Sequence, residues 1–264
     1  MKGLPKEPRV TTTVPAGPVL VFAPHPDDEI VGPGATLMKH VAQGDQVSVV
    51  IIFDGQRGDP EGHYADQDLC ALRQAESRLV ATQFLKTEDV FFHAFADGLT
   101  EGELDRFYPG LPDDPEEKLP ALLDGLAGLF REHIERTNPT TIYYPWQGEV
   151  HADHWACAEA MTRLLKADAA RFAEISVMGY EVWSTLLPEV LVDVSEVFDQ
   201  KMEAMSLYHT QTRYVDYPSL VKGLNRHRSY LMPHSEVPHD RRYAEAFVGE
   251  FRHLEGDKDA GRTS

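Results

Sequence analysis

The chain of 264 residues has few cysteines, no long apolar run and little positive charge. Its two cysteines, Cys70 and Cys157, exclude a disulfide framework as the basis of the fold and make a cytoplasmic location the default expectation. No apolar run approaches the roughly 18 residues that span a bilayer. The N-terminus also lacks the apolar segment of a secretory signal. We therefore expect a cytoplasmic protein with no membrane partner.

Negative charge dominates the composition, with 43 Asp and Glu against 25 Lys and Arg, a net charge of −18. Nucleic acids and anionic membranes are bound through basic surfaces, so neither is expected as a partner. Positive residues do gather in Ser219–Arg242, which holds five basic residues and two acidic ones. Two interpretations of this stretch stay open: a surface that binds an anionic part of a substrate, or a set of ordinary surface ion pairs.

Composition and periodicity together predict the fold class. Hydrophobic residues make up 42% of the chain, enough for a core, and no repeat or low-complexity linker divides it. We predict an N-terminal extension at residues 1–17, a single domain at 18–252 and a polar C-terminal tail at 253–264. Apolar strand patterns alternate with helical ones, which indicates an α/β protein. The prediction is a Rossmann-like, doubly wound and mostly parallel sheet in a three-layer arrangement.

The individual elements follow from the hydrophobic pattern. The expected strands are residues 19–23, 46–53, 90–93, 141–144, 175–183 and 190–194. The expected helices are residues 36–42, 67–85, 119–136, 155–166 and 197–208, followed by a mainly helical segment with loops. Residues 1–17 are expected to cover the surface, and the Pro-rich residues 100–117 to form an insertion near the site.

One imidazole and three carboxylates follow the first expected strand. The sequence His25-Pro-Asp27-Asp28-Glu29 comes directly after the buried pattern of Val19–Ala23. Ligands of open α/β sheets lie beyond the carboxyl ends of the strands. Carboxylates this close repel one another unless a cation or shared protons offset them. A divalent metal accounts for the cluster, whereas a solvated turn that caps a helix is the simpler alternative.

A second polar turn follows the strand expected at residues 141–144. It contains His151-Ala-Asp153-His154 and opens the next expected helix. This turn supplies the further nitrogen ligand that a metal site requires. Because two such turns at two strand ends of one sheet can converge, we expect a single site.

The two turns together resemble the PIG-L/LmbE superfamily of zinc-dependent N-deacetylases. The resemblance covers about residues 18–250 and departs from the family at Ala152, where members commonly have proline; this implies a change in loop stiffness without loss of chemistry. The matching stretches are Pro24-His25-Pro26-Asp27-Asp28-Glu29, His151-x-x-His154, Asp54-Gly55, Arg73-x-x-Glu76, Asp97-Gly98, Tyr180-Glu-Val-Trp183 and His209-x-Gln211.

The resemblance implies a metal site and a catalytic base. His25, Asp28 and His154 correspond to the metal ligands of the family motifs. This set suits Zn²⁺, and iron(II) accepts the same donors. Asp27 is then a carboxylate beside the metal that does not ligate it, and is expected to act as general base for the water that zinc activates.

The remaining polar residues of the two turns receive supporting roles. His151 should face the substrate and, as an imidazolium, stabilise the oxyanion and help to protonate the amine leaving group. Asp153 is expected to orient His151 or His154 and so hold its tautomer. For Glu29 two roles stay open, support of the metal ligands or capping of the helix at Thr36.

Three residues outside the two turns are candidates for substrate binding. Arg73 and Asp97 resemble family residues that hydrogen-bond sugar hydroxyls, and Arg57 lies in a polar loop on the same sheet edge. A surface salt bridge between Arg73 and Glu76, one helical turn apart, is the simpler interpretation of that arginine. The other nine histidines lack convergent spacing and are expected to be structural or exposed.

The function implied by the resemblance is metal-dependent hydrolysis of the acetamide of an N-acetylglucosaminyl compound. Similarity to the bacillithiol-pathway branch favours N-acetylglucosaminyl-malate, whose dicarboxylate the Ser219–Arg242 stretch would suit. Alternatives are an amidase for thiol conjugates, a deacetylase for chitooligosaccharides or glycosylated natural products, and a sugar-binding protein without turnover. The last is disfavoured because Asp27 and His151 are both present and no Gly-x-Gly-x-x-Gly follows the first strand. The family also implies a homo-oligomer.

Overall fold

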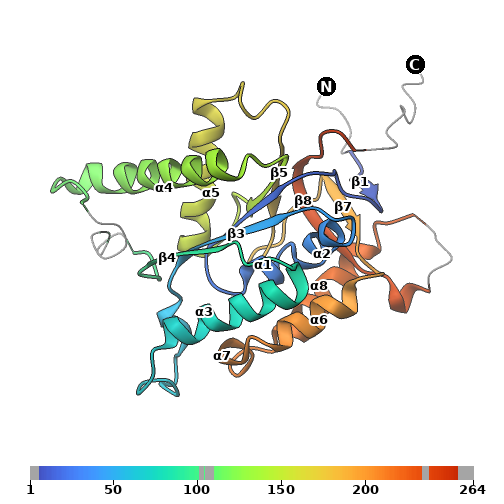
Figure 1. Cartoon of the computed structure of the whole chain (residues 1–264), viewed down its shortest axis with the longest axis horizontal. Helices are drawn as coiled ribbons and strands as arrows, with labels where there is room; N and C mark the ends of the chain where they lie inside the picture. The colour runs from blue at the N-terminus through green and yellow to red at the C-terminus, as the bar shows by residue number, and fades with distance from the viewer. Residues whose placement is uncertain (1–5, 101–103, 105–109, 234–237, 255–264) are drawn as a thin grey trace.

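A sheet of eight strands lies between two layers of helices in the computed structural model, which describes residues 6–100, 104, 110–233 and 238–254 (Figure 1). The strands are β1 (Arg9–Thr11), β2 (Val19–Ala23), β3 (Val47–Phe53), β4 (Val90–Phe95), β5 (Thr141–Pro145), β6 (Ser176–Tyr180), β7 (Val190–Asp193) and β8 (Ala244–Glu250). The helices are α1 (Asp28–Val31), α2 (Gly34–Ala42), α3 (Leu69–Val80), α4 (Pro115–Thr137), α5 (Ala152–Ala167), α6 (Phe198–Ser206), α7 (His209–Thr212) and α8 (Tyr217–Ser229). Short helical turns are η1 (Gln56–Gly58), the π-helical η2 (Ala81–Leu85) and η4 (His239–Arg241). Among the described residues, no helix has the length and apolar character needed to cross a membrane.

The strand order is β1-β7-β8-β6-β5-β2-β3-β4, and β2 is the middle one of the five consecutive parallel strands from β6 to β4. From β2 the chain continues through β3 and β4 on one side and then crosses to β5 and β6 on the other, all of them parallel. Such a reversal of direction opens a crevice at the carboxyl ends of the two central strands. The predicted doubly wound, mostly parallel α/β fold is confirmed, and both polar turns lie at this crevice.

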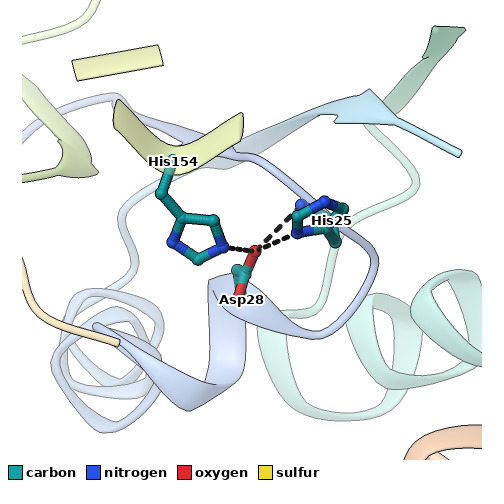
Figure 2. A group of neighbouring side chains, drawn as sticks. All are labelled: His25, Asp28 and His154. Atoms are coloured by element: carbon teal, nitrogen blue, oxygen red, sulfur yellow. Dashed lines mark hydrogen bonds and ion pairs between the residues drawn. The ribbon is translucent and has the colours of Figure 1, made fainter. Parts of the chain in front are cut away.

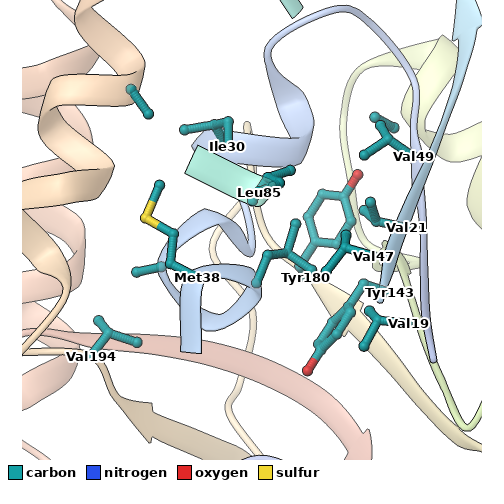
Figure 3. Packing of buried hydrophobic residues seen from close by; sticks show 14 of the residues in the cluster. Val19, Val21, Ile30, Met38, Val47, Val49, Leu85, Tyr143, Tyr180 and Val194 are labelled. Atoms are coloured by element: carbon teal, nitrogen blue, oxygen red, sulfur yellow. The ribbon is translucent and has the colours of Figure 1, made fainter. Parts of the chain in front are cut away.

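Strand β2 is buried on both faces, as its unbroken apolar sequence predicts. Val19 and Val21 belong to a core on one face of the sheet that also contains Met38 of α2 (Figure 3). Leu20 and Phe22 point to the opposite core, beneath α4 and α5. The alternation of side chains along a strand therefore gives the sheet a hydrophobic layer on each face.

Strand β8 corrects the expectation of a helical C-terminal region. It is antiparallel to both of its neighbours, β6 and β7. Its pattern is obscured by Glu245, which is buried and receives a 2.6 Å hydrogen bond from the buried Lys201. The same carboxylate accepts the backbone N–H groups of Ala35 and Thr36 at the start of α2. A charged residue in mid-strand is poor evidence of a strand in sequence alone, because its partner is distant in the chain.

The structure differs from the expected boundaries of the N-terminal extension and of the insertion. Strand β1 forms within the predicted extension 1–17 and pairs with β7, so part of that extension belongs to the sheet. Residues 101–103 and 105–109 of the expected insertion at 100–117 lie outside the described residues, and α4 begins within it at Pro115, where Asp114 accepts a hydrogen bond from the N–H of Glu116. Most of the tail predicted at 253–264 also lies outside the described residues, and the three-part division remains a prediction.

Candidate active site

A cavity of about 430 Å³ opens at the carboxyl edge of the sheet. This volume falls within the roughly 300–1,000 Å³ of small-molecule sites. Two predicted site residues, Asp153 and His154, lie beneath it and are fully buried. Seven of the nine line the cavity: His25, Asp27, Asp28, Arg57, Arg73, Asp97 and His151. The fold thus brings the predicted residues to one place.

The turn after β2 has an unusual backbone conformation. Asp27 has φ 127°, outside the regions that residues with a side chain normally adopt, and α1 begins at the next residue. The Asp27 N–H donates to Glu29 Oε2 at 3.0 Å, and the Tyr208 hydroxyl donates to Glu29 Oε1 at 2.6 Å. Glu29 therefore holds the strained turn, and its alternative role as a cap at Thr36 is wrong because Glu245 occupies that position.

Three side chains form a group that could hold a metal ion, shown in Figure 2. The Oδ2 atom of Asp28 lies 3.3 Å from Nδ1 of His25 and 3.1 Å from Nε2 of His154. Within the described residues, neither ring nitrogen of the buried His154 makes a hydrogen bond of good geometry, although Nε2 faces Asp28 Oδ2. An unsatisfied buried polar group costs about 1–3 kcal/mol. A metal ion would satisfy Nε2, and two nitrogens with one carboxylate oxygen are donors that suit zinc or iron(II).

Asp153 supports His25 from the side away from Asp28. Its Oδ2 atom lies 2.8 Å from Nε2 of His25. The backbone N–H groups of Gly98 and Leu99 donate to the same carboxylate at 2.8 and 2.7 Å. The expectation that Asp153 orients His151 or His154 is thus corrected: its Oδ2 atom is 3.9 Å from His151 Nδ1, and its close imidazole partner is His25. A carboxylate behind a metal-binding histidine fixes the tautomer and the ring.

Glu149 was not singled out from the sequence and lies behind His154. Its Oε2 atom is 3.6 Å from Nδ1 of that ring. The carboxylate also accepts the N–H groups of Val182, Trp183 and Ser184 at 2.7, 3.0 and 3.4 Å. It therefore connects the turn after β5 to the loop after β6. The sequence does show an acidic residue five positions before His154. It does not show that this residue holds a loop that begins more than thirty positions later in the chain.

The charges of the metal group are strongly interdependent. Burial by itself lowers the pKa of His25, but hydrogen bonds to Asp153 and Asp28 raise it to about 10. Burial raises the pKa of Asp28, yet the neighbouring His154 and His25 hold it well below its usual range. Asp153 likewise has its pKa lowered to about 2, because the hydrogen bond to His25 outweighs the effect of burial. The site is built to hold positive charge between these carboxylates.

Asp27 lies in the cavity but is not part of this group. Its Oδ2 atom is 3.3 Å from Nη2 of Arg73. Burial raises the pKa of Asp27 well above its ordinary value, Arg73 opposes this, and the negative charges of Asp28 and Glu29 reinforce it. Because Asp27 is next to the metal group but is not one of its three members, it can accept a proton without giving up a bond to a metal.

Arg73 is buried and serves the loops around the site. It donates to the carbonyl oxygens of Pro26 at 2.7 Å and Gly55 at 2.8 Å. Gly55 has φ 69°, and a Cβ there would lie 2.2 Å from the guanidinium, so the position requires glycine. The simpler interpretation, a surface bridge to Glu76, is wrong: Glu76 accepts hydrogen bonds from the N–H and hydroxyl of Thr210.

His151 caps the N-terminus of α5. Its Nδ1 atom accepts the N–H of Asp153 at 3.3 Å, so the proton of the neutral ring is on Nε2. Burial lowers the pKa of His151, and the positive charges of His25 and His154 lower it further. The predicted imidazolium is therefore disfavoured in the ligand-free site, but neutral Nε2–H remains a hydrogen-bond donor.

Asp97 and Arg57 lie next to each other on the cavity wall. The backbone N–H of Arg57 donates to both carboxylate oxygens of Asp97, at 3.2 and 2.9 Å. Burial raises the pKa of Asp97 above its ordinary value. Two of the three predicted substrate-binding residues are thus neighbours, and both line the cavity.

A family model described as "PIG-L: GlcNAc-PI de-N-acetylase" matches residues 20–165. The chain belongs to this family. A probable N-acetyl-α-D-glucosaminyl L-malate deacetylase 2 of Bacillus subtilis is 27% identical over 202 residues, which are 74% of this chain and 83% of the relative.

Two solved structures with lower identity share the fold of this PIG-L family member. The N,N′-diacetylchitobiose deacetylase of Pyrococcus horikoshii superposes with a TM-score of 0.64 at 19% identity, covering 89% of this chain and 84% of that one. The 4-carboxy-2-hydroxymuconate hydratase of Pseudomonas putida superposes with a TM-score of 0.62 at 18% identity, covering 90% and 98%. Because one fold carries a hydrolase and a hydratase, the reaction must be argued from the site.

The basic residues of Ser219–Arg242 do not reach the cavity of this PIG-L family member. Arg228 is buried and donates to the two carboxylate oxygens of Glu181 at 2.8 and 2.5 Å. Arg242 is buried and donates to the carbonyl of Pro233 at 2.6 Å. None of the five basic residues lines the cavity within the described chain. The described part of the stretch therefore supplies no cation to this cavity, which favours its interpretation as a set of ion pairs over that of a surface for an anionic aglycone.

Some residues of the outer wall of the cavity were expected from the sequence, and others were not. Trp183 and Gln211 belong to the family landmarks and do line the cavity. Tyr214, Val215 and Tyr217, around the start of α8, line it too and carried no signal in the sequence. This wall is aromatic and apolar, in contrast to the charged floor.

Proposed function

We propose that the protein is a metal-dependent N-deacetylase that hydrolyses the acetamide of an N-acetylglucosaminyl compound. The observation that carries the proposal is the metal group at the base of the cavity with Asp27 beside it and outside it. A protein that merely binds a sugar has no need of a further carboxylate at this position. The naming of the family and of the Bacillus relative as deacetylases supports the same reaction.

In this proposal His25, Asp28 and His154 hold the metal, which we propose to be zinc, with iron(II) as the alternative for the same donors. When bound, such a metal polarises the amide carbonyl and lowers the pKa of water to about 7. Asp153 and Glu149 keep the two imidazoles in orientation from behind.

The protein's own groups move the protons. Asp27, held by the strained turn and by Arg73, takes the proton of the attacking water. The Nε2–H of His151 donates a hydrogen bond to the oxygen on which negative charge develops, and the proton that Asp27 has taken from the water is the one that the departing amine receives. Arg73 acts through Asp27 and the loops, whereas Asp97 and Arg57 are the residues we assign to the sugar hydroxyls.

The test is a panel of N-acetylglucosaminides assayed for free amine and for acetate. An N-deacetylase releases both in equal amounts. A hydratase releases neither, and a binding protein leaves every compound intact. Absence of amine from the whole panel at micromolar enzyme would overturn the proposal.

Two further proposals concern the setting of the enzyme. Cys70 and Cys157 are both free thiols, which suits a reducing compartment and supports a cytoplasmic location. A homo-oligomer is proposed from the resemblance, and sedimentation velocity of the full chain tests it. The substrate class is a small N-acetyl amino-sugar compound.

A further inference from the structure

Trp183 forms an aromatic platform at the mouth of the cavity. Its side chain is 51% exposed, although the residue lines the cavity. One face of the indole lies over the His151 ring, with centroids 6.1 Å apart and planes at 25°. The ring of Tyr217, on α8, meets the indole edge-on at 6.4 Å and 76°. The indole therefore continues the wall that begins at His151.

This platform is held rigidly from below. The buried carboxylate of Glu149 accepts the N–H of Trp183 and of both adjacent residues. The neighbouring Val150 is 81% exposed, and its N–H donates to Ser184 Oγ at 3.0 Å, which places it against the same loop. Large apolar side chains exposed together beside a cavity are typical of a ligand-binding surface.

The charges around the platform restrict its ligand. The two arginines of the cavity, Arg57 and Arg73, come from η1 and α3. The cavity-lining residues around the start of α8 and in the loop after β6 are instead uncharged: Gln211, Tyr214, Val215, Tyr217 and Trp183. None of these five lining residues offers a cation to a carboxylate placed against this wall, whereas a ring with an apolar face can stack on the indole.

We propose that Trp183 is the stacking platform for the group attached to the N-acetyl sugar, and that this group carries a ring with an apolar face. The inference rests on the proposed function, because it is the acetamide at Asp27 and His151 that directs the remainder of the substrate past the His151 ring toward the indole. An aryl group and a second pyranose share the chemistry that this platform recognises. An open-chain dicarboxylate does not.

The test compares kcat/KM for methyl, phenyl and malyl N-acetylglucosaminides and for N,N′-diacetylchitobiose. Trp183→Ala should lower kcat/KM about 3- to 10-fold for the ring-bearing compounds, the size of one aromatic stacking contact. The values for the methyl and malyl glycosides should change less than about twofold, within the variation between exposed sites. Trp183→Phe should keep most of the efficiency, since an aromatic face remains. The compound whose kcat/KM falls more, the phenyl glycoside or N,N′-diacetylchitobiose, shows whether the platform prefers an aryl group or a second pyranose.

The matched control is Tyr230→Ala, which removes an aromatic side chain that is 76% exposed and does not line the cavity. It should leave all four compounds unaffected. An equal loss of kcat/KM for all four compounds in Trp183→Ala would show that Trp183 supports His151, and would contradict its role as a stacking platform. No loss for any compound, or a malyl loss as large as the phenyl one, would overturn it as well.

A binding measurement separates this inference from the proposed reaction. Titration with the phenyl glycoside should change the tryptophan fluorescence of the wild-type protein, and Trp183→Phe should abolish the change while two of the three tryptophans remain. If no compound yields amine, the deacetylase proposal fails, and the fluorescence titration alone then shows whether a ring stacks on Trp183. A response that persists in Trp183→Phe, or that is absent in the wild type, would contradict stacking on Trp183.

Discussion

Asp153 Oδ2 lies 2.8 Å from Nε2 of His25, while the Nδ1 atom of the same ring faces Asp28 Oδ2 at 3.3 Å. When a metal displaces the second proton of this ring, the proton on Nε2 would stay with Asp153 and the lone pair of Nδ1 would face the metal group. Asp153 is itself fixed by two backbone N–H groups of the loop after β4. One imidazole of the group that could hold a metal is thus oriented by a residue 128 positions away in the chain.

Asp153→Asn should weaken metal binding about 10- to 100-fold, the usual effect of losing the carboxylate behind a metal-binding histidine. Competition titration against a coloured chelator measures the change. Asp45→Asn is the matched control, because Asp45 makes a 2.7 Å hydrogen bond to His40 in a pair that does not line the cavity. An Asp153→Asn protein with wild-type metal affinity would show that the carboxylate does not orient His25.

Asp27→Asn should keep a full equivalent of metal and lose about 10²–10⁴ in kcat, because it removes a proton acceptor and no ligand. Glu29→Gln serves as the comparison, since Glu29 holds the Asp27 turn without lining the cavity. Its loss in kcat should be smaller. The reverse order of the two variants would assign the base to Glu29.

The metal group was predictable because each half of it is a short contiguous motif at a strand end. His25, Asp28 and His154 needed only the rule that parallel strands bring such ends to one edge. Partners distant in the chain were not predictable in the same way. Asp153 was assigned to the wrong imidazole, since proximity in sequence favoured His151 and His154. Nothing in the sequence placed Tyr217 beside the site.

The fold shows the same difference: elements with a clear local pattern were predicted, whereas those that depend on partners far away in the chain were not. Apolar runs such as Val19–Ala23 gave the central strands, and the helix from Ala152 was found with its start displaced by three residues. Strand β8 was missed because Glu245 interrupts its pattern, and that carboxylate is satisfied by Lys201, 44 positions earlier. Arg228 was assigned to the surface for the same reason, with its partner Glu181 47 positions away.

Arg228→Ala should destabilise the protein by about 3–5 kcal/mol, since it leaves the buried Glu181 without its cation. Urea unfolding measures the free energy. Arg226→Ala, at a partly buried residue that donates to the Asp240 carbonyl, should cost less than about 1 kcal/mol. At a temperature where Arg228→Ala is folded, its preference between malyl and methyl glycosides should equal that of the wild type. A changed preference would restore the interpretation of this stretch as an aglycone surface.

Acid should weaken the fold through His133, whose Nε2 atom lies 2.8 Å from Nε2 of His93. Burial lowers the pKa of His133 from 6.5 to about 4, and the positive charges of His93 and Arg136 add to the effect. The unfolded chain therefore binds this proton at higher pH than the folded protein does. Stability from the neutral ring is complete above pH 6.5 and is lost progressively as the pH falls toward about 4.

His133→Gln removes this proton and should flatten the acid side of the stability profile. The free energy of urea unfolding between pH 7.5 and pH 4.5 measures the slope for both proteins. His227→Gln, at an exposed histidine, should follow the wild-type profile. Parallel profiles for His133→Gln and the wild type would show that the ring is not held neutral by the fold.

The most direct measurement combines metal content with amine release from an N-acetylglucosaminide, for the wild type, His154→Ala and the exposed-site control His227→Ala. We expect one metal per chain in the wild type and the control, loss of amine release on chelation and its return with added zinc. His154→Ala, shown to be folded by circular dichroism, should hold no stoichiometric metal and release no amine. Undiminished amine release from metal-free wild type, or one tightly held metal in His154→Ala, would contradict a metal-dependent deacetylase built on His25, Asp28 and His154.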